Sequence, residues 1–299
     1  MNASAPRASL FDALIPLKTW WPVVAGLLLL YVPTYWMLAH GLWNSGDYAH
    51  GPIVLAVTLF LIWQQRAVFM AQPPGAPPRG QVVAGWALLG VGLLSYALGR
   101  SQDILLFEVG SQIPVILGAL LITLGTPAAR ALWFALFFLL FMIPLPGFFV
   151  DAVTGPLKQY ISVIAEQILY AVGYPIARSG VVLTIGQYQL LVADACSGLH
   201  SMFSLSAMGL LYLYLMEHTS RLRNLIIMAA IIPIAFAANI VRVMVLILVT
   251  YHLGDEAGQG FLHDFAGIML FIIGLLFLFL IDGILGFIFP DKPRARAKP

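Results

Sequence analysis

The chain is dominated by apolar runs that are long enough to cross a lipid bilayer. A transmembrane helix needs about 20 consecutive, mainly apolar residues, and runs approaching or exceeding this length recur between Trp20 and Phe287. Composition supports the same interpretation, because 61% of the 299 residues are hydrophobic and only 9% are charged. A soluble domain of this size carries more surface charge. The sequence therefore predicts an all-α polytopic membrane protein.

The apolar runs predict about eight transmembrane helices within one domain, residues 20–289. Short tails precede and follow it at 1–19 and 290–299, and the second is basic. Tryptophans near both ends of the first run are typical of membrane interfaces. The predicted spans are 20–43, 51–69, 81–98, 113–125, 131–143, 197–216, 225–251 and 265–287. Residues 100–112 and 252–264, which lie between spans and are polar, are expected to be loops.

The longest stretch without a spanning signal is residues 148–193. Its first part is amphipathic, with polar residues near one face and apolar residues near the other, which predicts a helix lying on the membrane. The polar residues are Lys158, Ser162, Glu166 and Gln167, and the apolar residues are Leu157, Ile161, Ile164, Ile168 and Leu169. Its second part, from Gly180 onwards, is rich in β-branched residues and has a turn signal at Gly186, which favours a short β-hairpin.

Basic residues in the loops predict the orientation of the eight spans. An excess of Lys and Arg marks the cytoplasmic side of a membrane protein. Of the basic residues outside the spans, only Arg100, Lys158 and Arg178 fall on the side opposite the termini. Both termini are therefore expected in the cytoplasm, and segment 148–193 is expected outside it. The residues expected on the cytoplasmic side are Arg7, Lys18, Arg66, Arg79, Arg130, Arg221, Arg223, Lys292, Arg294, Arg296 and Lys298.

The only cysteine, Cys196, precedes the sixth predicted span among polar residues: Asp194, Ser197 and His200. A single cysteine excludes an intrachain disulfide and a cysteine zinc cluster, and the sequence indicates no metal or cofactor. The thiol has two interpretations: a small buried hydrophobe, or a nucleophile activated by a nearby base. The amino end of the following helix would favour its thiolate.

Arg242 lies inside the seventh predicted span, with Asn239 one helical turn before it. A charge inside a membrane costs about 2.5–3.5 kcal/mol on insertion scales, so it is expected to face a polar cavity and a partner. Alternatively, the arginine side chain extends to the outer membrane surface, or it pairs with an acidic residue in a purely structural role. The asparagine alternatively forms an interhelical hydrogen bond.

His263 begins the eighth predicted span on the outer side, next to Asp264. The structural alternative is a helix start with Asp264 as its cap. A thiol, an arginine and an imidazole from three helices nevertheless all map to one side of the membrane. A cysteine nucleophile needs a base and a group that stabilises the oxyanion. We therefore predict a site of Cys196, Arg242 and His263, supported by Asn239, Asp194, Ser197 and His200.

Three segments of this chain, in this order, resemble the motifs of exosortases, membrane transpeptidases related to archaeosortases. The segments are DACSGLHSM from Asp194, NIVRVMVL from Asn239 and HDFAG from His263. The resemblance covers most of the chain in architecture and the last third in motifs. It implies that Cys196, Arg242 and His263 are the nucleophile, the arginine and the histidine of the family. Many relatives have Arg at the position of His200. The histidine in this chain resembles the B-type branch of the family.

The resemblance also implies the partners and the location. Substrates would be secreted proteins that carry a C-terminal sorting tail with a Pro-Glu-Pro motif, a membrane helix and a basic cluster. They would be transferred to an unknown acceptor nucleophile on the periplasmic face of the bacterial inner membrane, in connection with exopolysaccharide production. Membrane lipid is a further partner, and nucleic acid is not expected because the basic residues form no single patch.

Two other functions remain compatible with these residues. A polytopic transporter or assembly factor would use Arg242 to bind an anionic solute and Cys196 for packing. A cysteine protease at the membrane boundary would hydrolyse its substrate without ligation. The first predicts insensitivity to thiol reagents, and only product analysis separates the second from a transpeptidase.

Overall fold

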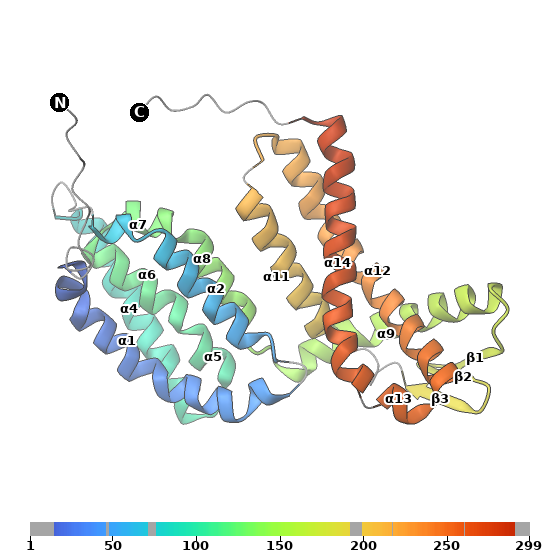
Figure 1. Ribbon diagram of the computed structural model, residues 1–299. Helices are drawn as coiled ribbons and strands as arrows, with labels where there is room; N and C mark the ends of the chain where they lie inside the picture. Colours follow the sequence, from blue (N-terminus) through green and yellow to red (C-terminus); the bar gives the residue numbers. More distant parts are fainter. Residues whose placement is uncertain are drawn as a thin grey trace, which may run out of the picture. The chain divides into compact units, whose positions relative to one another are not determined.

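The computed structural model describes residues 15–45, 48–70, 76–191, 199–216, 218–259 and 261–290 (Figure 1). These residues are mostly helical, as the sequence predicts. The chain divides into two compact units, Met1–Pro144 and Leu145–Pro299. Helices build both units, and the second unit also contains a small antiparallel sheet.

The first unit consists of four helices of 12 or more residues, α1, α2, α4 and α6, and several shorter ones. The longest are α1 and α4, and α5 and α6 follow α4 almost without a break. The elements are α1 (Ile15–His40), η1 (Leu42–Asn44), α2 (Gly51–Gln64), α3 (Ala67–Met70), α4 (Arg79–Ser101), α5 (Leu105–Gly110), α6 (Gln112–Thr123), α7 (Thr126–Ala131), α8 (Trp133–Phe138) and η2 (Leu139–Met142).

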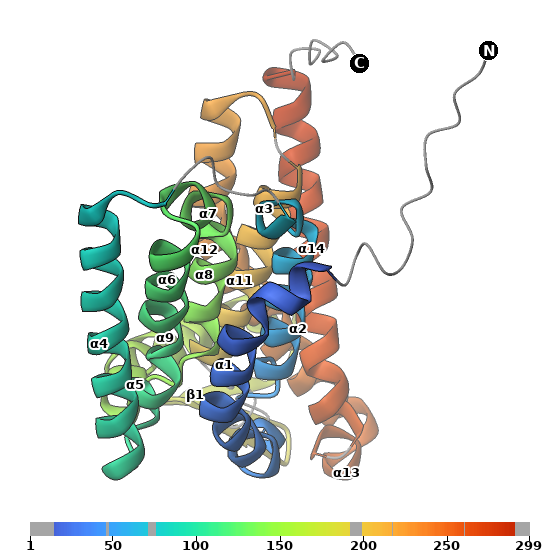
Figure 2. The same cartoon turned by 90° about the vertical axis from the view of Figure 1, so that its left-hand side faces the viewer.

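Helix α4 packs closely on α5 and α6 through glycines spaced seven residues apart, and Figure 2 shows α4 beside α6. A Cβ atom at Gly92 would lie 2.6 Å from Val115 Cγ2 and 2.9 Å from the Val115 nitrogen. One at Gly99 would lie 2.3 Å from the Glu108 nitrogen. Gly85 has a similar contact with Ile122. Small residues let helix backbones approach closely in membrane proteins, where packing replaces the hydrophobic effect as the driving force.

The loop that the sequence predicts at residues 100–112 is mostly helical and partly buried, so that prediction is wrong. Glu108 is 1% exposed on α5. Its Oε1 accepts hydrogen bonds from Thr34 Oγ1 at 2.6 Å and from Arg100 Nη1 at 3.2 Å. Nearby, the Tyr31 and Ser111 hydroxyls lie 2.9 Å apart. These polar residues can be buried because they pair with one another.

The second unit is built around α12, the longest helix described. Its 33 residues correspond to about 50 Å, more than the roughly 30 Å hydrocarbon core of a bilayer. The loop predicted at residues 252–264 is also mostly helical, because α12 continues to Leu253 and two more helices follow. The elements are α9 (Gly147–Ala171), β1 (Ile176–Ser179), β2 (Val182–Ile185), β3 (Tyr188–Leu191), α11 (Leu199–Met216), α12 (Arg221–Leu253), α13 (Asp255–Gln259) and α14 (Phe261–Ile288).

The predicted hairpin is present as β2 and β3, which pair in antiparallel register with Ile185 opposite Tyr188. Gly186 has φ +57° and begins the two-residue loop, as a type II′ turn requires. The sequence did not reveal β1, which pairs with the other edge of β2 to give the order β1-β2-β3. One face of this sheet packs on α9 and on Ile240, Val243 and Ile247 of α12.

Helix α9 confirms a helix in the amphipathic segment, but its buried face differs from the predicted one. Ser162 was placed on the polar face, yet it is fully buried, and its hydroxyl donates to the Lys158 carbonyl at 2.7 Å. Ile168 was placed on the apolar face, yet it is 41% exposed. The helix therefore turns Ile161, Ala165 and Leu169 towards the sheet and α12, and contact with these elements decides which side is buried.

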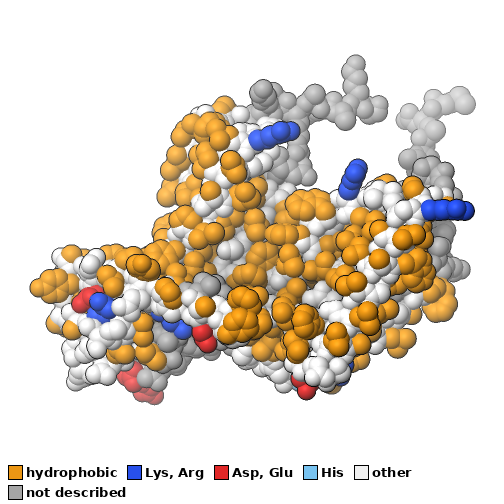
Figure 3. Space-filling view, turned by 180° about the vertical axis from the view of Figure 1, so that it is seen from behind, with side chains coloured by type: hydrophobic (Ala, Val, Ile, Leu, Met, Phe, Trp, Pro, Cys, Tyr) orange, Lys and Arg blue, Asp and Glu red, His pale blue; other side chains and the backbone are white. Residues whose placement is uncertain are grey.

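Large apolar side chains are exposed along the helices of both units, and Figure 3 shows them covering much of the visible surface. Leu29 of α1, Val83 of α4, Ile232 of α12 and Phe287 of α14 are all more than 60% exposed. Such surfaces are expected to face lipid. Within the described residues, five helices are long and apolar enough to span a membrane: Trp21–Asn44, Arg79–Ser101, Leu105–Thr123, Arg221–Leu253 and Ile268–Ile288. The chain is a polytopic membrane protein.

The glycine contacts of α4 make a testable prediction about stability. Replacing Gly92 with Ala forces a methyl group against Val115, so we expect the free energy of unfolding to fall by about 1–3 kcal/mol. Gly90 lies on the same helix with nothing within 4 Å of its added Cβ. Gly90→Ala is the matched control and is expected to leave stability unchanged or raise it by up to about 1 kcal/mol. Thermal unfolding of the two purified variants in detergent measures the difference, and equal values would contradict the close packing.

Candidate functional site

Three helices of the second unit bring the predicted site segments to a common end. Helices α11, α12 and α14 pack against one another (Figure 1). Short connections make successive helices antiparallel. The amino ends of α11 and α14 therefore lie at the same end of the unit as the carboxyl end of α12. Cys196 comes three residues before α11 begins, and His263 is the third residue of α14.

An apolar layer sets the relative heights of these helices. Leu205 of α11 and Leu270 of α14 pack against Ala235 and Ala238 of α12. The contact is close, because a Cβ atom at Gly274 would lie 2.4 Å from Leu205 Cδ1. On α12, Arg242 lies four residues from Ala238 of this layer, in the direction of the common end. In the same direction, His263 lies seven residues from Leu270 on α14, and His200 lies five residues from Leu205 on α11.

Arg242 and Asn239 are both buried on α12. Arg242 is 4% exposed and Asn239 is 0% exposed. They lie one helical turn apart on the same side of the helix. This side lies between the residues that pack on α11 and α14, such as Ala238, and those that pack on α9 and the sheet, such as Ile240 and Val243. Arg242 is therefore buried inside the protein, and the polar cavity expected around it stays a prediction.

Of the remaining predicted site residues, some have a described backbone and others lie outside the described residues. Cys196, Asp194 and Ser197 lie outside the described residues. His200 and His263 have described backbones in the first turns of α11 and α14, but their side chains are outside the description. The meeting of Cys196, Arg242 and His263 stays a prediction. In the described part of the chain, no group of three or more His, Cys, Asp or Glu side chains is arranged to hold a metal ion.

Comparison with known proteins places the chain in a family. A family model described as transmembrane exosortase matches residues 42–280, which is well over half of the chain. The chain belongs to the transmembrane exosortase family. The match extends over both units, and it agrees with the resemblance carried by the three motifs. No curated protein and no solved structure matches the chain.

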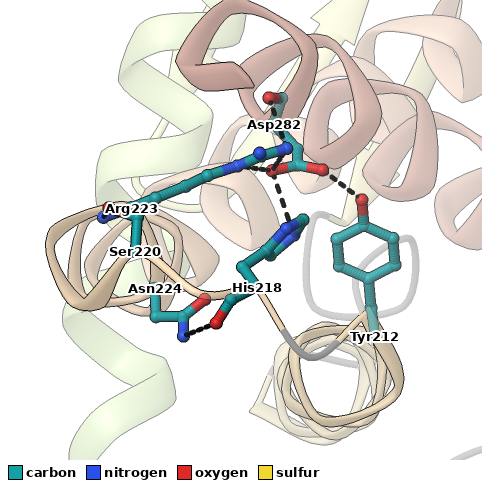
Figure 4. A network of polar contacts seen from close by, with 6 residues as sticks. All are labelled: Tyr212, His218, Ser220, Arg223, Asn224 and Asp282. Carbon is teal, nitrogen blue, oxygen red and sulfur yellow. Dashed lines mark hydrogen bonds and ion pairs between the residues drawn. The ribbon is translucent and has the colours of Figure 1, made fainter. Parts of the chain in front are cut away.

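In this exosortase, a second buried polar group lies at the other end of the same three helices (Figure 4). Asp282 of α14 is 5% exposed and accepts from Arg223 Nε of α12 at 2.8 Å. Arg223 Nη2 lies 2.7 Å from the same oxygen, Oδ1. The Tyr212 hydroxyl of α11 donates to Asp282 Oδ2 at 2.5 Å. His218 Nε2, from the α11–α12 turn, lies 3.4 Å from Oδ1.

Sequence reasoning did not identify this group, although a signal was present. Asp282 is the only charged residue in the apolar run 265–287, and an ionisable residue inside a span usually has a partner. Arg223 was counted only as a loop charge. The structure shows that it is buried and paired. The carboxylate links all three helices at the end opposite Arg242, so it helps to fix how they pack.

Removing the Asp282 carboxylate is therefore expected to destabilise the second unit. In Asp282→Ala, the buried Arg223 loses the carboxylate that it pairs with, and breaking a buried ion pair typically costs about 3–5 kcal/mol. Glu256→Ala removes an exposed acid from α13 and is the control, with an expected effect within about 0.5 kcal/mol. Thermal unfolding in detergent is the measurement. A similar unfolding temperature for the two variants would show that the exosortase does not need this ion pair.

Proposed function

We propose that the protein is a cysteine transpeptidase that cuts the sorting tail of secreted proteins and transfers them to an acceptor. Its family is one of membrane transpeptidases. The observation that carries the assignment of residues is the placement of Arg242. It is buried on α12 at the end of the bundle where α11 follows Cys196 and α14 contains His263. Three antiparallel helices thus direct the three motif segments to one end.

The first chemical step is attack by the Cys196 thiolate on the carbonyl carbon of the scissile peptide bond. His263 accepts the thiol proton, and the C–S bond forms as the carbonyl π electrons move onto oxygen. Arg242 stabilises this oxyanion or orients a substrate carboxylate. Helix α11 begins at Leu199, so the dipole of its amino end favours the thiolate.

The second part of the reaction releases the tail and forms the product. The C–N bond breaks, His263 gives its proton to the leaving amine, and the acyl group stays on Cys196 as a thioester. An acceptor nucleophile then attacks the thioester and gives its proton to His263, and the thiolate leaves as the C–S bond breaks. If water is the acceptor, the same site works as a protease, which is the nearest alternative. A transporter that binds an anionic solute at Arg242 is the alternative from another class.

The substrates and the location follow from the family resemblance. We expect secreted proteins with a C-terminal Pro-Glu-Pro motif, one membrane helix and a basic cluster. The exosortase would lie in the bacterial inner membrane with both termini in the cytoplasm. The predicted span count of eight is reached if three less regular segments cross the membrane together with the five long helices. These are α2, α11 and the run formed by α7, α8 and η2.

In this orientation the site lies close to the outer membrane surface. Helix α12 is longer than a bilayer needs, and its residues 240–251 contact the sheet. If the sheet lies outside the hydrocarbon region, the outer turns of α12 lie there too. Arg242 then sits near the boundary rather than two turns inside it. A boundary position lowers the cost of its charge and lets a secreted substrate reach it.

The decisive test is co-expression with a tailed substrate. Wild type is expected to remove the tail, and Cys196→Ala is expected to leave it intact while remaining folded, because no thiolate is available. Ser206→Ala is the control on α11, since among the described residues its hydroxyl bonds to the Met202 carbonyl of the same helix. It is expected to process normally. Mass analysis of the new C-terminus distinguishes transfer from hydrolysis, and full processing by Cys196→Ala would refute the proposal.

A separate prediction concerns orientation. Fusing a reporter that is active only in the cytoplasm to the C-terminus is expected to give signal. A reporter that is active only in the periplasm, fused at the same place, is expected to be silent. Inserting the periplasmic reporter in the β1–β2 turn at Gly180 should give the reverse result, because this turn belongs to segment 148–193. A silent periplasmic reporter at Gly180 would place the predicted site on the wrong side for secreted substrates.

A further inference from the structure

Asn239 has a buried side chain that the described structure leaves unsatisfied. The residue is 0% exposed. Neither Oδ1 nor Nδ2 has a hydrogen-bond partner among the residues that the structure describes. A buried polar group without a partner costs about 1–3 kcal/mol, and an asparagine amide has an acceptor and a two-proton donor to satisfy. This cost requires an explanation.

A structural role does not supply the explanation. Asparagine in a membrane helix commonly forms a hydrogen bond to a neighbouring helix. The sequence left this structural role open for Asn239 as the alternative to a role in the site. In the described residues of α9, α11 and α14, no atom makes that bond. An apolar side chain at position 239 would pack among the neighbouring helices without leaving an unsatisfied amide. The amide is therefore better explained by a ligand that it binds.

The position of Asn239 limits what that ligand can be. It lies one helical turn from Arg242 on the side of α12 that faces the bundle interior. Measured from the common end of the three helices, it is the deeper of the two. In the proposed reaction, the substrate tail continues from the scissile bond into a membrane helix. The part of the substrate that lies deeper than Arg242 is therefore the leaving side, between the scissile bond and that helix.

The chemistry of the side chain matches a peptide backbone. A primary amide offers one acceptor and one donor side by side, which complement the N–H and C=O groups of a peptide chain. Such groups are unsatisfied at the start of the substrate helix, because the first four N–H groups of a helix lack intrahelical partners. In a lipid environment they need a partner from protein. A charged substrate group would be bound better by Arg242 than by an uncharged amide.

We infer that Asn239 is a substrate-binding residue whose side-chain amide hydrogen-bonds the backbone of the leaving tail, where the tail enters the membrane. This inference rests on the proposed function. Oδ1 accepts from a backbone N–H of the first turn of the substrate helix, and Nδ2 donates to a backbone carbonyl next to it. These contacts hold the scissile bond at a fixed height relative to Arg242 and do not depend on the side chains of the tail.

The test combines activity and stability in Asn239→Leu and Asn239→Ala. Both are expected to lower the rate of tail removal about 10- to 100-fold, because one positioned hydrogen bond is worth a comparable factor in other sites. Both are expected to unfold at the same or a higher temperature than wild type, since an unsatisfied amide is removed. The rate at which iodoacetamide alkylates Cys196 should stay within about twofold of wild type, as expected for an intact thiol environment.

Thr58→Val is the matched control. Thr58 of α2 is 2% exposed, and its Oγ1 also has no partner among the described residues. It lies in the other unit, far from the motif segments in the chain. Its replacement should affect stability in the same direction as the Asn239 variants. Tail removal should remain at the wild-type rate.

The outcomes separate this inference from the proposed function. If Cys196→Ala is inactive but both Asn239 variants process the substrate at the wild-type rate, the inference fails and the proposed function stands. If both Asn239 variants unfold at clearly lower temperatures than Thr58→Val, the amide has a structural partner and the inference also fails. If Cys196→Ala processes the substrate, the proposed function itself fails. Loss of processing with stability and alkylation preserved supports the inference.

Discussion

Charge burial among apolar helices is the constraint on which the second unit depends. Helix α12 carries two buried arginines, Arg223 in its first turn and Arg242 about two thirds of the way along it. Arg223 is held by Asp282 of α14, which also accepts from Tyr212 of α11. In a medium of low dielectric such a group is stable only when its polar atoms are paired. The ion pair therefore helps to fix how α11, α12 and α14 pack, and Arg242 lies towards the opposite end of the same bundle.

The two ends of this bundle differ in a way that suits a binding site. At the Asp282 end, the carboxylate has partners from two other helices and from the turn between them. At the other end, the amide of Asn239 is buried without a partner among the described residues. A rigid, satisfied end can hold a less satisfied end in place, and unsatisfied buried groups are more common where a ligand binds.

Several predictions from the sequence failed for the same physical reason. Residues 100–112 and 252–264 were expected to be loops because they contain charges, amides and glycines. The structure shows helices in both. Glu108 is buried because Thr34 and Arg100, distant in sequence, supply its hydrogen bonds. Ser162 can be buried because a carbonyl of its own helix accepts a hydrogen bond from its hydroxyl. Polarity alone does not show whether a residue finds a partner, so it is a poor guide to exposure.

The sequence by itself determined the class of the protein, most of its helices, the hairpin of β2 and β3, and the burial of Arg242. These features depend on the length of apolar runs, on turn residues such as Gly186 and on the cost of a charge in lipid, all of which are local properties of the chain. Only the tertiary structure decided which polar residues pair, that β1 completes the sheet, that glycines 85, 92 and 99 admit a neighbouring helix, and that Asp282 joins three helices. Each of these depends on which distant segments meet, because a hydrogen bond or a close contact needs both partners in place.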